Sequence, residues 1–513
     1  MKRWFLYAGW LLMFVWAQAQ DTPYRLPDVY ALRGAKIVSN SAPPIDSGVI
    51  AVRNGVIVAL GDANTPIPAD AEVIDASGHT VYPGFIDAFS SLGMPAQAND
   101  AAYASYERGN THRNPQIRPE RQATVLVQPD SGQWARWRRA GFVAAHIAPP
   151  HGIMSGQSAV ISLNTGAPAE LVIVPQYGVV LNLRGRGAFE GGGGYPSSLM
   201  GAIALVRQTF YDAQHQAQVW QAYRRDPNGK PRPAMSRALE ALQPVLERKQ
   251  PLLAIANNAE DIRRVLRIAD EFNLRVIIVG GQEAAKVAEE LKRREIPVLL
   301  SMEMPEPLRS YDPLSPPTLT SLRNRALAYQ NAAILHEQGV RFAFTTEGLG
   351  DPERLLRNIR TAIANGLPQD AALRALTLTP AELLGIQDKF GDLAVGKTAS
   401  FVVVRGELFE PRARIEFVFA DGKRYKLSET TPTAAASPTP QFRRPRDWDA
   451  ENTSSLHEAS CCYHHAHGST LTHMHSHDHE AHHCEDSCTE HLTAGVPPRQ
   501  DTPREAGMQT EGV

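Results

Sequence analysis

The chain has 513 residues, which is too long for one ordinary domain and long enough to bury a large core. Its 43% hydrophobic and 21% charged residues are typical of a globular protein, and a formal net charge of -2 gives no electrostatic reason to bind nucleic acid. We therefore expect two domains with additional segments, and we expect no nucleic-acid partner.

The amino terminus has the pattern of a secretory signal. Two basic residues precede an apolar run over residues 4–16, and a small-x-small cleavage site follows at residues 17–19. The apolar run has about 13 residues, whereas a membrane-spanning helix needs about 20. We expect residues 1–19 to be removed, leaving an exported protein, periplasmic or secreted, with no integral membrane segment. A retained membrane anchor is the alternative.

Short β-rich runs separated by turns occupy residues 30–80. The pair Asn54-Gly55 separates two of these runs, and Asn-Gly is a strong hairpin signal because both residues accept a positive φ. Similar runs recur at the far end of the chain, over residues 389–427, where Asp421-Gly422 marks another turn. We predict that the two regions form one small composite β-sandwich domain around an inserted domain.

Residues 81–388 alternate strand-like runs with helical stretches, which is typical of a parallel sheet covered by helices. The runs that start at Pro251, Arg275, Pro297 and Arg341 are almost continuously apolar, as expected for strands buried on both faces. About 300 residues suit a closed barrel better than an open doubly wound sheet. The predicted fold class is therefore α/β, a TIM-like (β/α)8 barrel plus the composite β-domain.

The composition changes sharply after Leu427. Residues 428–440 are mostly Thr, Pro, Ala and Ser, and the segment beyond them holds 11 of the 17 histidines and all four cysteines. We predict a disordered tail over residues 428–513. Imidazole and thiolate ligands suit Zn, Ni or Cu. The alternatives are a surface tail without a metal function and a stretch translated from a displaced reading frame. The candidate metal ligands are His464, His465, His467, His473, His475, His477, His479, His482, His483, Cys484 and Cys488.

Three stretches, residues 73–87, 366–385 and 391–399, occur in the right order at both ends of the predicted barrel. Through them, residues 30–427 resemble the amidohydrolase superfamily, and specifically its imidazolonepropionase-like, secreted branch. Residues 152–159 also resemble an element of that branch. The resemblance implies a metal-dependent hydrolase of C–N bonds other than ordinary peptide bonds, including bonds in cyclic amides or dipeptide-like substrates.

The resemblance also implies a set of metal ligands at the strand ends: a His-x-His pair after strand 1, a mid-barrel ligand, one histidine each after strands 5 and 6, and an aspartate after strand 8. Phe89 and Ser91 stand where the pair belongs, Asn257 and Gly280 stand at the ends of strands 5 and 6, and Glu347 replaces the aspartate. A phenyl ring cannot coordinate a metal, and a serine hydroxyl is a poor zinc ligand. We therefore predict degenerate ligand positions and no metal cofactor in the barrel.

His146 and His151 lie in and after a predicted strand, and we expect them to face the same opening as Glu347 and Asp87. The two histidines form either a substitute acid/base site or ordinary hydrogen bonds. For Asp87 the alternative is a structural role, in which its carboxylate holds the end of the strand in place.

Three functions remain open. The first is an impaired hydrolase that binds a small molecule at the barrel mouth and acts through Glu347 with His146 or His151. The second is a pseudoenzyme, a non-catalytic scaffold for a second amidohydrolase subunit that has an intact metal site. The third is metal sequestration by the histidine-rich tail.

Overall fold

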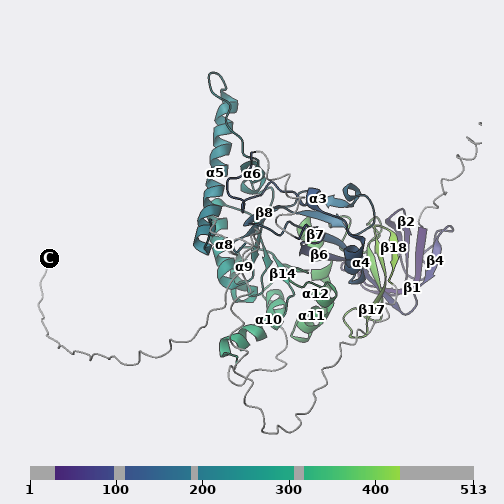
Figure 1. The fold of residues 1–513 in the computed structure, drawn as a ribbon. Coiled ribbons are helices and arrows are strands. Elements are labelled where there is room, and N and C mark those ends of the chain that lie inside the picture. Colours follow the sequence, from purple (N-terminus) through teal and green to yellow (C-terminus); the bar gives the residue numbers. More distant parts are fainter. Residues whose placement is uncertain (1–28, 97–109, 186–194, 306–316, 428–513) are drawn as a thin grey trace, which may run out of the picture. The chain divides into compact units, whose positions relative to one another are not determined.

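The computed structural model describes residues 29–96, 110–185, 195–305 and 317–427 (Figure 1). The predicted signal segment and the predicted metal-binding tail lie outside these residues. Within the described parts of the chain, no helix has the length and apolar character needed to cross a membrane.

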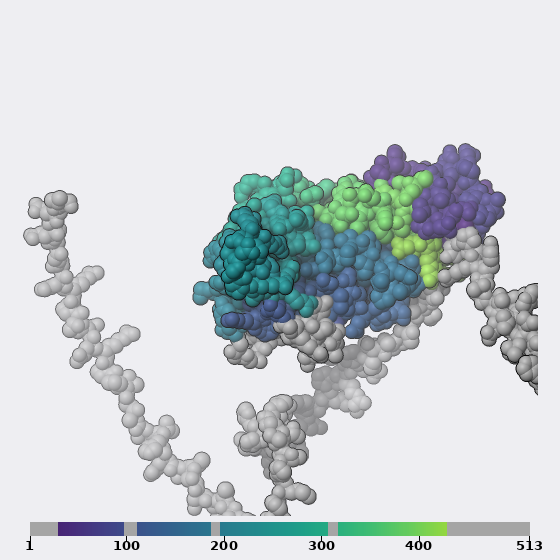
Figure 2. All heavy atoms as spheres, turned by 90° about the horizontal axis from the view of Figure 1, so that it is seen from above, coloured from purple at the N-terminus to yellow at the C-terminus, as the bar shows by residue number. Residues whose placement is uncertain are grey.

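Both ends of the described chain contribute to one eight-stranded sheet, in the order β18-β17-β16-β5-β1-β2-β3 with β4 beside β1. β16 pairs antiparallel with β5, with Phe401 opposite Pro83. Figure 2 shows the purple amino-terminal strands and the yellow-green carboxyl-terminal residues lying against each other. The strands are β1 (Val29–Ile37), β2 (Ile45–Arg53), β3 (Val56–Gly61), β4 (Glu72–Asp75), β5 (His79–Pro83), β16 (Phe401–Arg405), β17 (Arg414–Ala420) and β18 (Lys423–Lys426).

The pairing of the two chain ends is as predicted, but hydrogen bonds join all eight strands into a single sheet, whereas a sandwich has two. The backbone N–H of Ala399 donates to the carbonyl of Gly55 at 2.8 Å, which links the turn between β2 and β3 to the segment just before β16. The predicted hairpin turns are present, since Asn54 and Gly55 have φ values of 51° and 80°. Gly422 packs against the first turn so closely that a Cβ built on it would lie 2.3 Å from the Cα of Gly55.

The middle of the chain is an α/β structure with two further sheets, ordered β10-β9-β7-β6 and β15-β14-β13-β12-β11-β8. β6 and β7 are parallel, and so are β11 to β15 in succession. The strands are β6 (Phe85–Ser90), β7 (Phe142–Ile147), β8 (Met154–Gln157), β9 (Ala159–Ser162), β10 (Val172–Val174), β11 (Val179–Asn182), β12 (Leu252–Ala256), β13 (Val276–Gly280), β14 (Val298–Ser301) and β15 (Phe342–Thr345).

Helices connect these strands, which confirms the α/β class. The helices are α3 (Ala123–Leu126), α4 (Ser131–Arg139), α5 (Leu199–Arg225), α6 (Arg237–Ala241), α7 (Gln243–Leu246), α8 (Ala259–Phe272), α9 (Ala288–Arg293), α10 (Leu319–Glu337), α11 (Glu353–Ala364), α12 (Gln369–Leu376) and α13 (Leu378–Leu384), with the 3-10 turns η1 (Pro168–Leu171) and η2 (Ala284–Val287). Because the hydrogen-bonded strands fall into two sheets, the closed eight-stranded barrel stays a prediction.

Side chains on one face of the parallel strands pack into an apolar group that we term the interior cluster. The opposite faces of the same strands pack into the larger core, since successive side chains of a strand point to opposite sides. Both faces are therefore buried, as the apolar runs predicted. The interior cluster consists of Ala88, Phe89, Ala148, Val180, Leu253, Ile277, Val279, Leu299 and Ala343.

Candidate functional site

We term the loops after the carboxyl ends of β6, β12, β13, β14 and β15 the mouth, because parallel α/β folds place their sites there. Phe89, at the first predicted ligand position, is only 3% exposed and belongs to the interior cluster. Its ring packs edge-to-face on His146, with 5.5 Å between ring centroids. Ser91 is half-buried directly after β6. Phe89 is thus a core residue, and its phenyl group offers no ligand atom.

The ends of β12 and β13 approach each other closely at the mouth. Gly280 has a φ of +96°, and a Cβ built on it would lie 2.0 Å from Oδ1 of Asn257. The backbone carbonyl of Asn257 accepts a hydrogen bond from the N–H of Glu283 at 2.8 Å. Any side chain at position 280, including an imidazole, would therefore displace the Asn257 amide and adopt a backbone conformation that L-residues disfavour.

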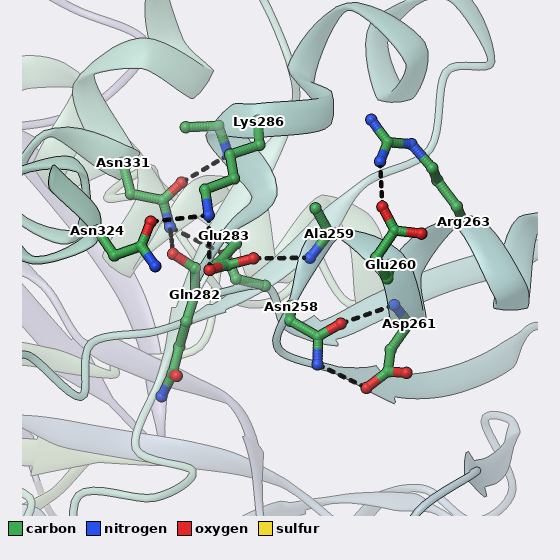
Figure 3. A network of polar contacts seen from close by, with 12 residues as sticks. Asn258, Ala259, Glu260, Asp261, Arg263, Gln282, Glu283, Lys286, Asn324 and Asn331 are labelled. Atoms are coloured by element: carbon green, nitrogen blue, oxygen red, sulfur yellow. Dashed lines mark hydrogen bonds and ion pairs between the residues drawn. The ribbon is translucent and has the colours of Figure 1, made fainter. Parts of the chain in front are cut away.

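A hydrogen-bond network fixes the loops that follow β12 and β13 (Figure 3). The Glu283 carboxylate accepts from the Ala259 N–H at 3.1 Å and from Lys286 Nζ at 2.7 Å. Asn331 of α10 donates to the Gly281 carbonyl at 2.9 Å and accepts from a backbone N–H of η2. These polar groups bind one another, so this part of the mouth has a structural role.

Two carboxylates occupy neighbouring strand ends on the other side of the mouth. Glu347 is half-buried, and its carbonyl accepts a hydrogen bond from Ser301 Oγ at 2.7 Å. Glu303 accepts from Gln282 Nε2 at 3.0 Å and lies against Gly348, where a built Cβ would be 2.8 Å from Glu303 Oε2. The sequence reasoning missed Glu303. Its position two residues after β14 is a signal that could have revealed it, because Glu347 stands two residues after β15.

The two candidate histidines differ in burial and in hydrogen-bond partners. His146 is fully buried in β7, and its Nδ1 lies 2.8 Å from the Ala88 carbonyl. Its ring lies between Phe89 and Tyr177, with 5.0 Å between the His146 and Tyr177 centroids. His151 lies in a loop, where its Nε2 is 2.9 Å from the Ala96 carbonyl. We expected both histidines to face one opening. For His146 this expectation is corrected, because its ring is buried and packs on two aromatic rings.

Burial lowers the pKa of His146 to about 4, from an ordinary value of about 6.5. The unfolded chain therefore takes up a proton below about pH 6.5 that the folded protein does not bind until about pH 4. We expect the free energy of unfolding to fall by about 3 kcal/mol as the pH is lowered through this window. Denaturant unfolding at stepped pH measures the slope.

The matched variants are His146→Gln, which removes the buried imidazole, and His336→Gln on the exposed face of α10. The first should flatten the pH dependence relative to the wild-type protein, and the second should leave it unchanged. An unaltered slope in His146→Gln would contradict the assignment of this titration to His146.

Asp87 is fully buried and joins β6 to two other elements. Its carboxylate accepts from the Thr346 N–H at 3.0 Å, from Thr346 Oγ1 at 2.5 Å and from Trp137 Nε1 of α4 at 3.0 Å. Burial raises the pKa of Asp87. These bonds agree with the structural reading of Asp87, and they tie the end of β15 to β6. No pattern in the sequence identifies Trp137 and Thr346 as hydrogen-bond partners of Asp87.

Comparison with known proteins relates the chain to one family of hydrolases. A family model described as the amidohydrolase family matches residues 318–427. An amidohydrolase from Thermotoga maritima MSB8, known from its crystal structure, is 25% identical, with a TM-score of 0.64 over 78% of this chain and 100% of that chain. The family match covers about a fifth of this chain, and together with the structural likeness it supports the amidohydrolase superfamily. The chain also matches an adenine deaminase from Moorella thermoacetica, at 38% identity over 63 residues. That match covers 12% of this chain and 11% of the deaminase, so it spans only about a ninth of that relative.

The amidohydrolase superfamily implies a metal at the mouth, which would need a suitable set of donor atoms there. Within the described residues, no three His, Cys, Asp or Glu side chains are grouped closely enough to hold a metal ion. The described mouth has carboxylates at Glu303 and Glu347, whereas zinc sites of catalytic type use imidazole or thiolate with carboxylate. The described residues of the mouth do not fit such a centre.

Proposed function

We propose that this amidohydrolase-superfamily chain is impaired as a metal-dependent hydrolase of C–N bonds and retains the fold as a small-molecule binding or scaffold domain. The observation that carries the proposal is the role of Phe89, which packs into the interior cluster at the first predicted ligand position. Metal-assisted hydrolysis needs an ion that lowers the pKa of bound water to about 7, and such an ion needs ligands. The positive φ of Gly280 beside Asn257 supports the same conclusion at a second ligand position.

Finer assignments belong to the same proposal. Residues 152–159 support placement in the imidazolonepropionase-like branch, and the amino-terminal pattern supports export. A second amidohydrolase subunit with an intact metal site is the partner we propose for the scaffold form. The carboxylates of Glu303 and Glu347 would then bind a ligand group that is cationic or donates hydrogen bonds.

Metal analysis tests the proposal. The structure describes residues up to Leu427, so a chain ending at Thr431 keeps all of the described residues and lacks the histidine-rich segment. After purification in zinc-containing buffer and dialysis, we expect this shortened chain to hold far less than one zinc per molecule and to hydrolyse no cyclic amide or dipeptide-like substrate. The full-length chain is the control, and we expect it to retain zinc through the tail. One or two bound zinc ions in the shortened chain would overturn the proposal.

A substitute acid/base site gives a different result. In that case the shortened chain would hydrolyse a substrate without bound metal, and Glu347→Gln would abolish the activity. Glu353→Gln is the matched control, because Glu353 begins α11 and has an exposed carboxylate. Activity that is lost in the first variant and kept in the second would favour the impaired but catalytic form over the scaffold.

A further inference from the structure

A cavity of about 620 Å³ lies at the amino ends of β13, β14 and β15, where Arg275, Pro297 and Arg341 precede the strands. The ends of α8 and α9 and part of α13 complete its wall. Its volume is within the range of small-molecule sites, about 300–1,000 Å³. Because the mouth is at the carboxyl ends of the same strands, this cavity is a separate feature from the candidate site.

The strand pattern directs two arginines toward the axis of the cavity. Side chains two residues apart in a strand share a face. Arg275 precedes Ile277 by two residues, and Arg341 precedes Ala343 by two, and both apolar residues belong to the interior cluster. Arg275 and Arg341 therefore extend the interior face beyond the amino ends of their strands. β14 lies between the two strands, so the two backbones are about 10 Å apart.

The other two cations of the cavity already have partners. Arg248 donates to Oδ1 of Asn273 at 2.6 Å, at the end of α8, and Arg294 pairs with Asp270 at 2.7 Å. These two arginines are placed to offset the partial negative charge of the helix ends. Arg275 and Arg341 are therefore not needed to offset the charge of these helix ends.

By contrast, the side chains of Arg275 and Arg341 form no hydrogen bond or ion pair with any residue that the structure describes. Three carboxylates line the cavity: Asp270, Glu295 and Glu382. Asp270 pairs with Arg294 and Glu382 pairs with Arg374 at 2.9 Å, so Glu295 is the one that could offset the charge of Arg275 or Arg341. The cavity therefore has an excess of unpaired positive charge.

Tyr177 is half-buried and lines the cavity. Its hydroxyl donates to the Leu383 carbonyl, and its ring packs on His146. Burial raises the pKa of Tyr177 to about 12, and the positive charge of Arg275 acts in the opposite direction. Arg275 and Tyr177 both line the cavity, and the Arg275 side chain is exposed to solvent.

We propose that this cavity is a binding site for a small polyanion, which has two or more carboxylate or phosphate groups held by Arg275 and Arg341. Guanidinium groups suit both kinds of oxyanion, because their N–H donors match the spacing of two oxygens. The spacing of the two strands favours a ligand with at least two acidic groups over a single carboxylate. Glu295 would sit at the rim and limit the number of negative charges that the cavity accepts.

The test is calorimetric titration of the full-length protein at low ionic strength with citrate, pyrophosphate and acetate as probes. We expect citrate or pyrophosphate to bind at least about tenfold more tightly than acetate. The preferred probe of the two distinguishes a carboxylate ligand from a phosphate ligand. We expect Arg275→Gln and Arg341→Gln each to weaken binding about tenfold or more, since a charge-assisted hydrogen bond is lost.

Arg412→Gln is the matched control, because Arg412 is an exposed arginine outside the cavity. It should bind the probes as the wild-type protein does, and circular dichroism should show that all three variants are folded. Equal affinity in the wild type and in both cavity variants would overturn the proposal, as would equal loss in the control. Absence of binding by both citrate and pyrophosphate at millimolar concentration would also overturn it. The outcome is independent of zinc content and of hydrolysis.

Discussion

Asp87→Ala should lower the free energy of unfolding by about 4 kcal/mol, because it leaves two buried donors of Thr346 and the half-buried indole N–H of Trp137 without an acceptor. The wild-type carboxylate accepts from the backbone and hydroxyl of Thr346 and from the indole of Trp137, with no exposure to solvent. Each unsatisfied buried donor costs about 1–3 kcal/mol, and rotation of the hydroxyl recovers part of this. Denaturant unfolding of the variant and the wild type measures the difference.

Trp137→Phe is the matched control for Asp87→Ala. It removes one donor and leaves the carboxylate with both bonds from Thr346, so we expect a loss of about 1–2 kcal/mol. Equal losses in the two variants would contradict a role of Asp87 in joining β6 to β15. The raised pKa adds a second measurement, since the folded protein holds this proton more tightly than the unfolded chain. The contribution of Asp87 to stability therefore falls as the pH rises above about 3.9, and Asp87→Asn should lack that fall.

Gly422→Ala should lower the free energy of unfolding by about 3 kcal/mol or more, because two effects add. Gly422 has a φ of +78°, which an alanine adopts at a cost of about 1 kcal/mol. Its Cβ would also lie 2.3 Å from the Cα of Gly55 and 2.8 Å from the nitrogen of that residue. Backbone atoms of a second hairpin cannot move aside as a side chain can, so the composite sheet must distort.

Gly78→Ala separates the two effects. Gly78 has the same φ of +78°, but a Cβ there would meet no atom within 4 Å. We expect this control to lose only the conformational cost of about 1 kcal/mol. If the thermal unfolding midpoints of the two variants were shifted equally, the close approach of the two hairpin turns would make no contribution to the loss of stability in Gly422→Ala.

Local chemistry made much of the fold predictable. Asn54-Gly55 gave its hairpin because both residues tolerate a positive φ, and the apolar run after Arg275 gave β13 because that strand is buried on both faces. Pairing between strands was harder to predict. Hydrogen bonds join the composite domain into one sheet. Contacts such as that of Asp87 with Thr346, which link β6 to the end of β15, follow from no local pattern.

The candidate site was less predictable than the fold. Sequence position alone marked Phe89 and Gly280 as unusual, but it did not show that Phe89 would fill the interior or that Gly280 would face the Asn257 amide. His146 was expected at the mouth because it lies near the end of a strand, whereas side-chain alternation in β7 turns it inward onto Tyr177. These outcomes depend on approaches between segments far apart in the sequence.

The hydrogen bond from the Tyr82 hydroxyl to Glu407 joins residues that are 325 positions apart. On a ribosome, β5 is therefore complete long before β16 exists, and its open edge must wait while the whole intervening region is synthesised. Contacts of such long sequence separation form slowly, because the loop between them has to close first. Any chain that stops before β16 leaves β5 without its antiparallel neighbour, so a truncated product would present an unpaired strand edge that favours aggregation.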